Sequence, residues 1–299
     1  MRGNCSAIFL LSHSPISTDQ AGDALLSGDS SRISSVKHHN LTFRNGTQAD
    51  NAGSKGQSQT RQTQTLLSAL DFDGEYGRQY RQSSQNSIPG HDVLHEIAIA
   101  AVNTTSAHAS RILVVGPGPG DELIPLLNSC PDADVTVIEP SAQMLDLCAR
   151  SVADHADAKR CRFLRSTLAD ALHSGLQPNR FDLVVCHNVV HLVAPAEQTV
   201  MLQQLRDLTA TGGSLLVSSY SEAEAPETVT TILNVARQRL ISRGVSLDRI
   251  DQLLASRNSV VFSLDARRLT NVLSQQGWSE PMQLYQGLFA RLWLCRAPT

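Results

Sequence analysis

One segment constrains the fold of this chain more than any other: an apolar run that ends in a glycine-rich turn. The run covers residues 112–115, and Gly116, Gly118 and Gly120 follow it at every second position. Consecutive apolar residues are typical of a strand buried on both faces. Glycines allow a sharp turn and a close approach of the backbone to a ligand. Acidic residues and a helical pattern come next, so the segment indicates a parallel strand that turns into a helix at a ligand site.

A second apolar run, residues 135–138, ends on Glu139. A glycine turn after one strand and an acid at the tip of the next form a minimal site for an adenosine-containing cofactor. A dinucleotide site needs a third glycine, but the two possible registers place Asp121 or Leu123 there. Asp121 and Glu122 would also repel a pyrophosphate at the helix N-terminus. The pattern therefore disfavours a nicotinamide oxidoreductase and favours S-adenosylmethionine, which has no phosphate and carries a positive sulfonium.

Strands and helices alternate regularly after residue 110, which predicts a parallel sheet covered by helices on both faces. The connection between the last two apolar runs is too short for a parallel crossover, so these strands must be antiparallel. We therefore expect an α/β, Rossmann-like doubly wound sheet, mostly parallel with an antiparallel last strand. The expected strands cover residues 111–115, 134–139, 162–165, 181–186, 214–218, 282–285 and 289–296.

Composition divides the chain into four parts. Residues 1–65 are dominated by polar residues and cannot bury enough apolar area to offset their ordering entropy, so we expect this segment to be disordered. Residues 66–105 are expected to form an N-terminal helical cap, and residues 221–262 a helical lid inserted after strand five. The cofactor-binding core is then formed by residues 106–220 and 263–299.

Charge and cysteine content exclude several classes of partner. The net charge is -3 without a long basic run, which argues against nucleic acid as a partner. No apolar stretch reaches the roughly 20 residues that span a bilayer, so we expect no membrane partner and a cytoplasmic location. The six cysteines show no metal-binding spacing and are expected to be reduced thiols.

Four motifs in this order resemble those of class I S-adenosylmethionine-dependent methyltransferases, in particular bacterial enzymes that act on small molecules. The motifs are the glycine turn 116–120, the acid and its neighbours 139–141, the strand with its following loop 181–191, and the turn into strand five 212–216. The resemblance covers about residues 70–297. It implies methyl transfer to nitrogen, oxygen or carbon of a small-molecule acceptor by in-line displacement, in a monomer or homodimer.

The same resemblance assigns residues to the site. Glu139 should hold the two ribose hydroxyls, since a carboxylate only accepts hydrogen bonds. Thr167 stands where the family often has an aspartate at the adenine, which weakens that contact or leaves it to backbone groups. The implied cofactor-binding residues are Gly116, Pro117, Gly118, Gly120, Glu139, Pro140, Ser141, Met144, Thr167, Leu168, His187, Tyr76 and Tyr80.

His191 is the candidate catalytic residue. It lies just past strand four, where a histidine can act as a general base or only shape the pocket. His187 and His191 are spaced like a metal-binding pair, but no third ligand accompanies them, so no metal is expected. A protein that binds S-adenosylmethionine without catalysis, as a regulator or partner, is the alternative to an enzyme.

Overall fold

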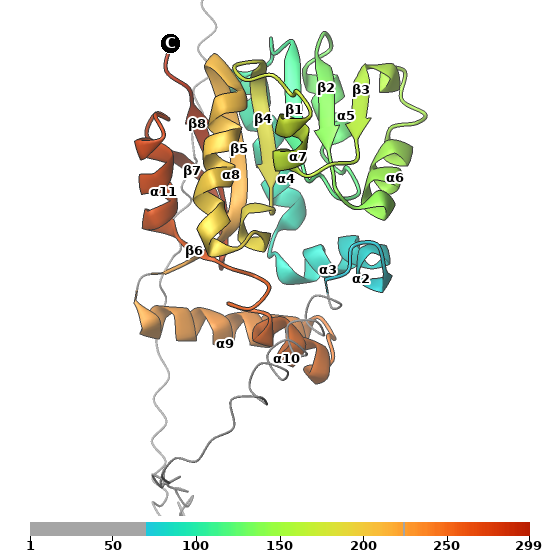
Figure 1. Ribbon diagram of the computed structural model, residues 1–299. Coiled ribbons are helices and arrows are strands. Elements are labelled where there is room, and N and C mark those ends of the chain that lie inside the picture. Colours follow the sequence, from blue (N-terminus) through green and yellow to red (C-terminus); the bar gives the residue numbers. More distant parts are fainter. Residues whose placement is uncertain (1–69, 224) are drawn as a thin grey trace, which may run out of the picture. The chain divides into compact units, whose positions relative to one another are not determined.

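The computed structural model describes residues 70–299 except residue 224, so the polar segment 1–65 and residues 66–69 of the expected cap lie outside the described part. Its centre is an eight-stranded sheet in the order β3-β2-β1-β4-β5-β8-β7, with β6 paired to β5 (Figure 1). The strands are β1 (Arg111–Val115), β2 (Asp134–Ile138), β3 (Cys161–Leu164), β4 (Phe181–His187), β5 (Thr209–Glu222), β6 (Leu264–Asp265), β7 (Met282–Gly287) and β8 (Ala290–Arg296).

Helices connect nearly all of these strands. The helices are α2 (Glu75–Arg78), α3 (Tyr80–Ser87), α4 (His91–Thr105), α5 (Leu123–Ser129), α6 (Ala142–Ser151), η1 (Ala158–Arg160), α7 (Leu168–His173), η2 (Val190–Leu192), α8 (Pro195–Leu208), α9 (Pro226–Ser242), α10 (Leu247–Ala255) and α11 (Ala266–Gln275).

The parallel part of the sheet reverses its order between β1 and β4. β1 pairs with β2 on one side and with β4 on the other, all parallel. Neighbouring crossovers therefore leave in opposite directions at the carboxyl ends of these two strands, where ligands of such sheets bind. The turns after β1, β2 and β4 all open at this edge.

The end of the sheet is antiparallel, as the short final connection predicts. β8 runs antiparallel to both β5 and β7. Leu288, in the turn between β7 and β8, has a positive φ of 56°, which lets the chain reverse within two residues. The expected fold class is confirmed: a Rossmann-like sheet, mostly parallel, with an antiparallel end.

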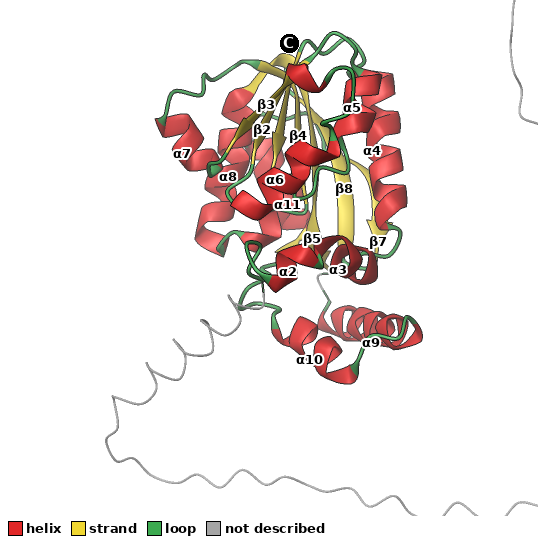
Figure 2. Cartoon of the chain, turned by 90° about the vertical axis from the view of Figure 1, so that its right-hand side faces the viewer, coloured by secondary structure: helices red, strands yellow, loops and turns green. Residues whose placement is uncertain are grey.

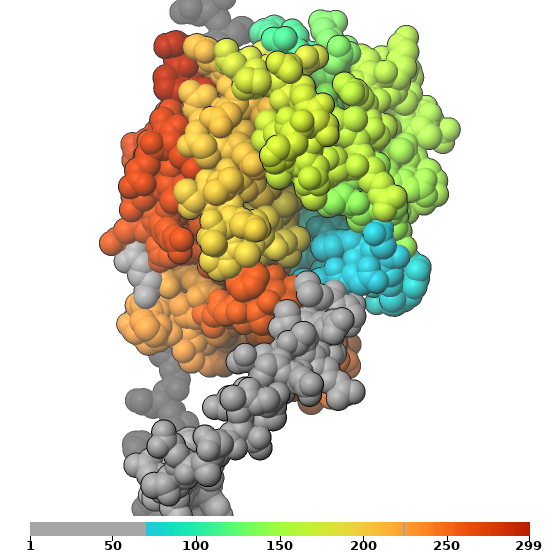
Figure 3. All heavy atoms as spheres, viewed as in Figure 1, coloured from blue at the N-terminus to red at the C-terminus, as the bar shows by residue number. Residues whose placement is uncertain are grey.

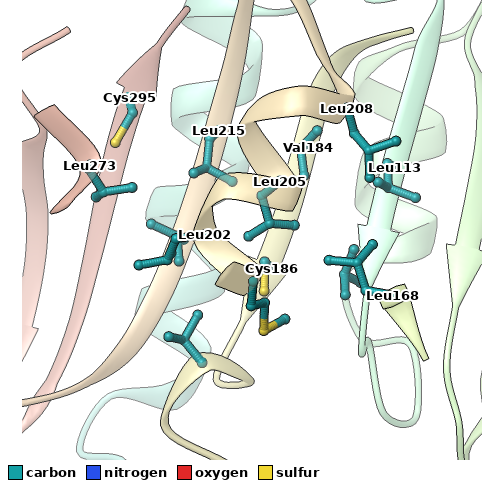
Figure 4. Close-up of a cluster of buried hydrophobic side chains, with 14 of the residues drawn as sticks. Leu113, Leu168, Val184, Cys186, Leu202, Leu205, Leu208, Leu215, Leu273 and Cys295 are labelled. Atoms are coloured by element: carbon teal, nitrogen blue, oxygen red, sulfur yellow. The ribbon is translucent and has the colours of Figure 1, made fainter. Parts of the chain in front are cut away.

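Side chains of β1 alternate between two hydrophobic cores, one on each face of the sheet. Leu113 and Val115 join a core with α7, α8 and α11, which Figure 4 shows around Leu202, Leu205 and Leu208. Ile112 and Val114 join the opposite core with α4, α5 and α6. Figure 2 shows these two helical layers on either side of the strands. The sheet is thus buried on both faces, which explains why its strands read as unbroken apolar runs.

Two pairs of helices lie at the end of the sheet where β1 and β4 finish. Figure 1 shows α2 and α3 there, next to α9 and α10 of the segment inserted after β5. The guanidinium of Arg239 on α9 donates to the carbonyl of Asn86 at α3, and Arg243 Nε donates to Asn86 Oδ1 over 3.0 Å. α4, in contrast, packs on the sheet through Leu94 and Ala98.

β5 is longer than the expected strand 214–218 and begins before the glycine pair. Thr209 already pairs with Phe181, and the register shifts before Leu183 meets Ser214. Gly212 takes a φ of 73° within this irregularity. Glycine usually interrupts a strand, but here it allows a bulge that keeps β5 paired with β4.

Within residues 70–223 and 225–299, no helix is both long enough and apolar enough to cross a membrane. The cysteines in this part of the chain are free thiols, as expected, and all except Cys161 are buried. Burial raises the pKa of the Cys186 thiol to about 12.

Candidate functional site

The glycine turn after β1 adopts a backbone that only glycine takes readily. Gly116, Gly118 and Gly120 have φ values of 63°, 57° and 80°. The turn is held at its start by the N–H of Gly116, which donates to the carbonyl of Ile138 over 2.8 Å. Each glycine is also in close contact with a different neighbour. An added Cβ would lie 2.5 Å from Val189 at Gly116, 3.2 Å from the Tyr80 ring at Gly118, and 2.8 Å from Cys148 Sγ at Gly120.

Substitution of Gly120 by alanine should destabilise the fold by about 2–4 kcal/mol. The strain of a positive φ adds to the overlap of the new Cβ with Cys148 and Ser151 on α6. Gly175 is a matched control, since it has a φ of 97° but no atom within 4 Å of an added Cβ. Gly175→Ala should cost about 1 kcal/mol from the backbone alone. Urea denaturation of both variants measures the difference, and equal losses would show that the contact at Gly120 is unimportant.

Glu139, at the end of β2, faces this turn. Its carboxylate accepts the N–H of Gly118 over 3.3 Å and the N–H of Ser141 over 3.0 Å. The side chain is buried, and burial raises its pKa although both hydrogen bonds lower it. The sequence predicted that this acid lies beside the glycine turn, and in the structure its carboxylate is hydrogen-bonded to Gly118 of that turn.

Ser141 joins the site to the residues that precede α2. Its Oγ caps α6 by accepting the N–H of Met144 over 3.1 Å, and it donates to Asp73 Oδ1 over 2.7 Å. Asp73 also accepts the N–H of Gln143 over 3.0 Å. Met144 is fully buried beneath this cap, whereas Pro140 is exposed. Asp73 was missed by the sequence reasoning, because nothing local marks an acid that caps a helix about 70 residues away.

Three aromatic rings stand over the glycine turn. Tyr76 and Tyr80 were expected here, and Phe72 completes the group, with ring centroids 5.3 Å from Tyr76 and 5.7 Å from Tyr80. The Tyr80 ring lies 3.2 Å from the position that a Cβ on Gly118 would take. Burial raises the pKa of both tyrosines, so the phenols stay protonated. The guanidinium of Arg249 on α10 lies 5.9 Å from the Tyr76 ring, which connects the inserted helices to the aromatic group.

Thr167 and Leu168 have local roles at the start of α7. Thr167 is exposed and caps the helix, accepting the N–H of Asp170 over 3.1 Å. Leu168 is buried in the core below. The backbone connects this segment to the site, since the N–H of Ser166 donates to the carbonyl of Glu139 over 3.3 Å.

His187 is buried at the end of β4 and lies away from the large cavity described below. Its Nδ1 is 3.3 Å from Ser218 Oγ, and its ring is 5.4 Å from that of His95. His95 and Glu122 line a small cavity with it. Burial lowers the pKa of both histidines and raises that of Glu122 to about 8, so all three groups are neutral near pH 7.

His191 lies on the wall of a large cavity. Its ring stacks on Tyr220 at a centroid distance of 4.4 Å and an interplanar angle of 10°. The N–H of Tyr220 donates to His191 Nδ1 over 3.2 Å. Between β4 and η2, Asn188 takes a positive φ of 59° and accepts a hydrogen bond from Ser218, which turns the chain toward the cavity.

The large cavity contains about 1130 Å³ of empty space, with the open solvent at its mouth included, and about 160 Å³ of this space admits the centre of a water molecule. The cap, the inserted segment and the ends of β5 and β8 surround it. It adjoins the glycine turn through Tyr80. Among the described residues that line it, the charged side chains are Glu222 and Arg257, which form a two-pronged ion pair with N–O distances of 2.5 Å. Figure 3 shows the blue surface of α2 and α3 and the orange surface of α9 and α10 in the lower part of the molecule.

Tyr220, Glu222 and Arg257 were not identified from the sequence. Tyr220 and Glu222 follow the expected end of strand five, so only the longer β5 brings them to the cavity. Arg257 is on the segment after α10, which carries no motif. No cluster of metal-binding side chains occurs in the part of the chain that the structure describes, where His187 and His191 have separate partners.

The described side chains suit S-adenosylmethionine. Glu139 offers an acceptor-only carboxylate to a pair of hydroxyls. The Tyr76 and Tyr80 rings present π-faces near the glycine turn that would stabilise a sulfonium. Asp121 follows the turn and would disfavour a phosphate, which this cofactor does not have.

Comparison with known protein families identifies one domain in this chain. Residues 112–213 match the family described as a methyltransferase domain. No curated protein sequence matches the chain.

Solved methyltransferase structures share the fold. Magnesium protoporphyrin IX methyltransferase from Synechocystis is 15% identical with a TM-score of 0.56, over 78% of this chain and 99% of that one. The 1,6-didemethyltoxoflavin N1-methyltransferase from Burkholderia thailandensis is 13% identical with a TM-score of 0.51, over 85% and 94%. An O-methyltransferase family protein from the same organism is 14% identical with a TM-score of 0.55, over 81% and 69%. Residues 112–213 therefore form a methyltransferase domain, and the fold of the chain is that of solved methyltransferases.

Proposed function

We propose that this chain is an enzyme that transfers a methyl group from S-adenosylmethionine to a small-molecule acceptor bound in the large cavity. The observation that carries this proposal is the position of the cavity, which opens beside Tyr80 and the glycine turn and is covered by two separate chain segments. An enclosed cavity of this kind suits a metabolite, whereas a protein or nucleic acid requires an open surface.

The side chains of the site would bind, orient and desolvate the reactants. S-adenosylmethionine supplies a methyl group already activated by the sulfonium charge. Glu139 and the glycine turn would hold the cofactor, while the Tyr76 and Tyr80 rings would exclude water from it. His191, Tyr220 and Asn188 would face the acceptor on the opposite wall. Orientation and desolvation of this kind account for much of the rate of a displacement reaction.

Two measurements test the proposal. Calorimetry should show that the full chain binds S-adenosylhomocysteine and does not bind NAD. Incubation with methyl-labelled S-adenosylmethionine and a deproteinised cell extract should then label a low-mass product. Label on protein or RNA in a complete extract would contradict the small-molecule assignment. Cofactor binding without transfer to any acceptor would instead favour a protein that binds the cofactor without catalysis.

A further inference from the structure

The protonation state of His191 follows from its surroundings. A backbone amide can only donate a hydrogen bond, so the N–H of Tyr220 requires an unprotonated Nδ1 on His191. The neutral ring therefore carries its proton on Nε2. Burial lowers the pKa of His191 to about 3, which keeps the ring neutral at physiological pH.

Contacts to both the ring and the backbone hold His191 in place. Tyr220 stacks on it, and Ser219 Oγ lies 3.4 Å from Nδ1. The N–H of Phe262, at the end of the inserted segment, donates to the His191 carbonyl over 2.7 Å. With Nδ1 occupied, Nε2–H is the hydrogen-bonding atom that this residue can offer to a bound molecule. It is a donor and cannot take a proton.

The other titratable side chains that line the described cavity are protonated phenols or are engaged by a partner. Burial raises the pKa of the phenols of Tyr76, Tyr80 and Tyr220. The Glu222 carboxylate is paired through both oxygens with Arg257. An acceptor bound here must therefore bring a nucleophilic atom that needs no proton removed by the cavity.

We propose that the acceptor is a conjugated ring compound with an acidic hydroxyl, bound as its oxyanion against the Nε2–H of His191. This inference rests on the proposed methyltransferase function and assigns His191 as a positioning residue in place of a general base. The attacking oxygen forms the new O–CH₃ bond as the C–S bond breaks with its electron pair remaining on sulfur, and no proton moves.

Charge and shape support an oxyanion of this class. The walls are mainly apolar, so an isolated anion would bind poorly. The sulfonium of the cofactor would neutralise the anion, and a preorganised N–H donor would stabilise it further. The stacked pair of His191 and Tyr220 presents a flat surface that suits a planar ring.

The test uses para-nitrophenol and a more acidic dichloro derivative, whose anions absorb visible light. Each is titrated with pH in the presence of the full chain and sinefungin, a cofactor analogue with an ammonium group at the position of the methyl. We expect both probes to bind as anions, with each apparent pKa below that of the free probe and the two midpoints separated as they are in water. A common midpoint for both probes would indicate a general base of the protein and would overturn the inference.

His191→Leu should weaken anion binding about ten- to a hundred-fold, because it removes a charge-assisted hydrogen bond. His191→Asn keeps an N–H donor and should restore part of the affinity. His173→Leu is the matched control, since His173 is exposed on α7 and bonds only its own helix. Sinefungin binding and melting temperature establish that each variant is folded.

Two outcomes separate this inference from the proposed function. Normal sinefungin binding without binding of either phenol, or with binding of the neutral phenol, would overturn the acceptor class and leave the methyltransferase assignment intact. Failure of sinefungin to bind the unaltered chain would overturn both.

Discussion

Glu139→Ala should weaken the binding of S-adenosylhomocysteine by about 2–3 kcal/mol, or roughly 30- to 150-fold. The carboxylate is buried at the end of β2 and is held by the N–H groups of Gly118 and Ser141. Those two donors orient it but leave further lone pairs for two hydroxyls of a ribose. Alanine removes the acceptor and leaves both N–H groups without their partner.

Calorimetry on three variants isolates this effect. Glu139→Gln keeps the shape but places an NH₂ group near the two N–H donors, so its affinity should fall between those of the unaltered chain and the alanine variant. Asp134→Ala removes an exposed acid at the other end of the same strand and should bind normally. Unchanged binding by Glu139→Ala would contradict a ribose-binding role. The melting temperatures separate a loss of affinity from a loss of stability, because alanine also leaves the N–H groups of Gly118 and Ser141 without a partner.

Glu122→Gln should make the protein more stable at high pH but not at low pH. Glu122 is only 4% exposed beside the glycine turn. Burial raises its pKa from 4.5 to about 8, and the charges of Asp121 and Glu139 add to the shift. The folded state therefore favours the protonated carboxyl. Its contribution to stability is fully present below about pH 4.5 and is lost as the pH rises toward about 8.

Glutamine resembles the protonated acid and cannot ionise, so the variant escapes this loss. We expect its advantage in free energy of unfolding to grow from near zero at low pH to about 3–5 kcal/mol above pH 8. Urea denaturation across this range measures it. Glu96→Gln makes the same charge change at an exposed site on α4 and is the matched control. The buried histidines are the same in the unaltered chain and in both variants, so their effect cancels when the free energies of unfolding are compared. A constant difference across pH would show that Glu122 does not titrate in this window.

The main lines of the fold could be predicted from local patterns. Unbroken apolar runs indicated parallel strands buried on both faces, and the short turn at Leu288 left only an antiparallel arrangement for the last two strands. The limits of β5 could not be predicted in this way. The glycine pair suggested that the strand starts at residue 214, but the bulge at Gly212 extends its pairing back to Thr209.

The candidate site also contains some residues that could be predicted from the sequence and others that could not. Gly118 and Glu139 were identified together because each follows a recognisable strand and the carboxyl ends of adjacent parallel strands meet at one edge. The resemblance predicted that Tyr80 binds the cofactor, but it did not predict that the Tyr80 ring packs beside Gly118. The ion pair between Glu222 and Arg257, and the cap on α6 formed with Asp73, join residues that no periodicity relates.

The two histidines after strand four show most clearly what the sequence could predict and what it could not. Sequence position marked both His187 and His191, since both follow strand four, but it could not tell which chemistry either supports. The structure places His187 in a small cavity beside Glu122 and His191 in the large cavity against Tyr220. Identity and spacing along a chain select secondary structure through local backbone sterics. The protonation of a side chain depends on which distant N–H and which apolar surface surround it, and the packing of β5 and the inserted segment supplies both.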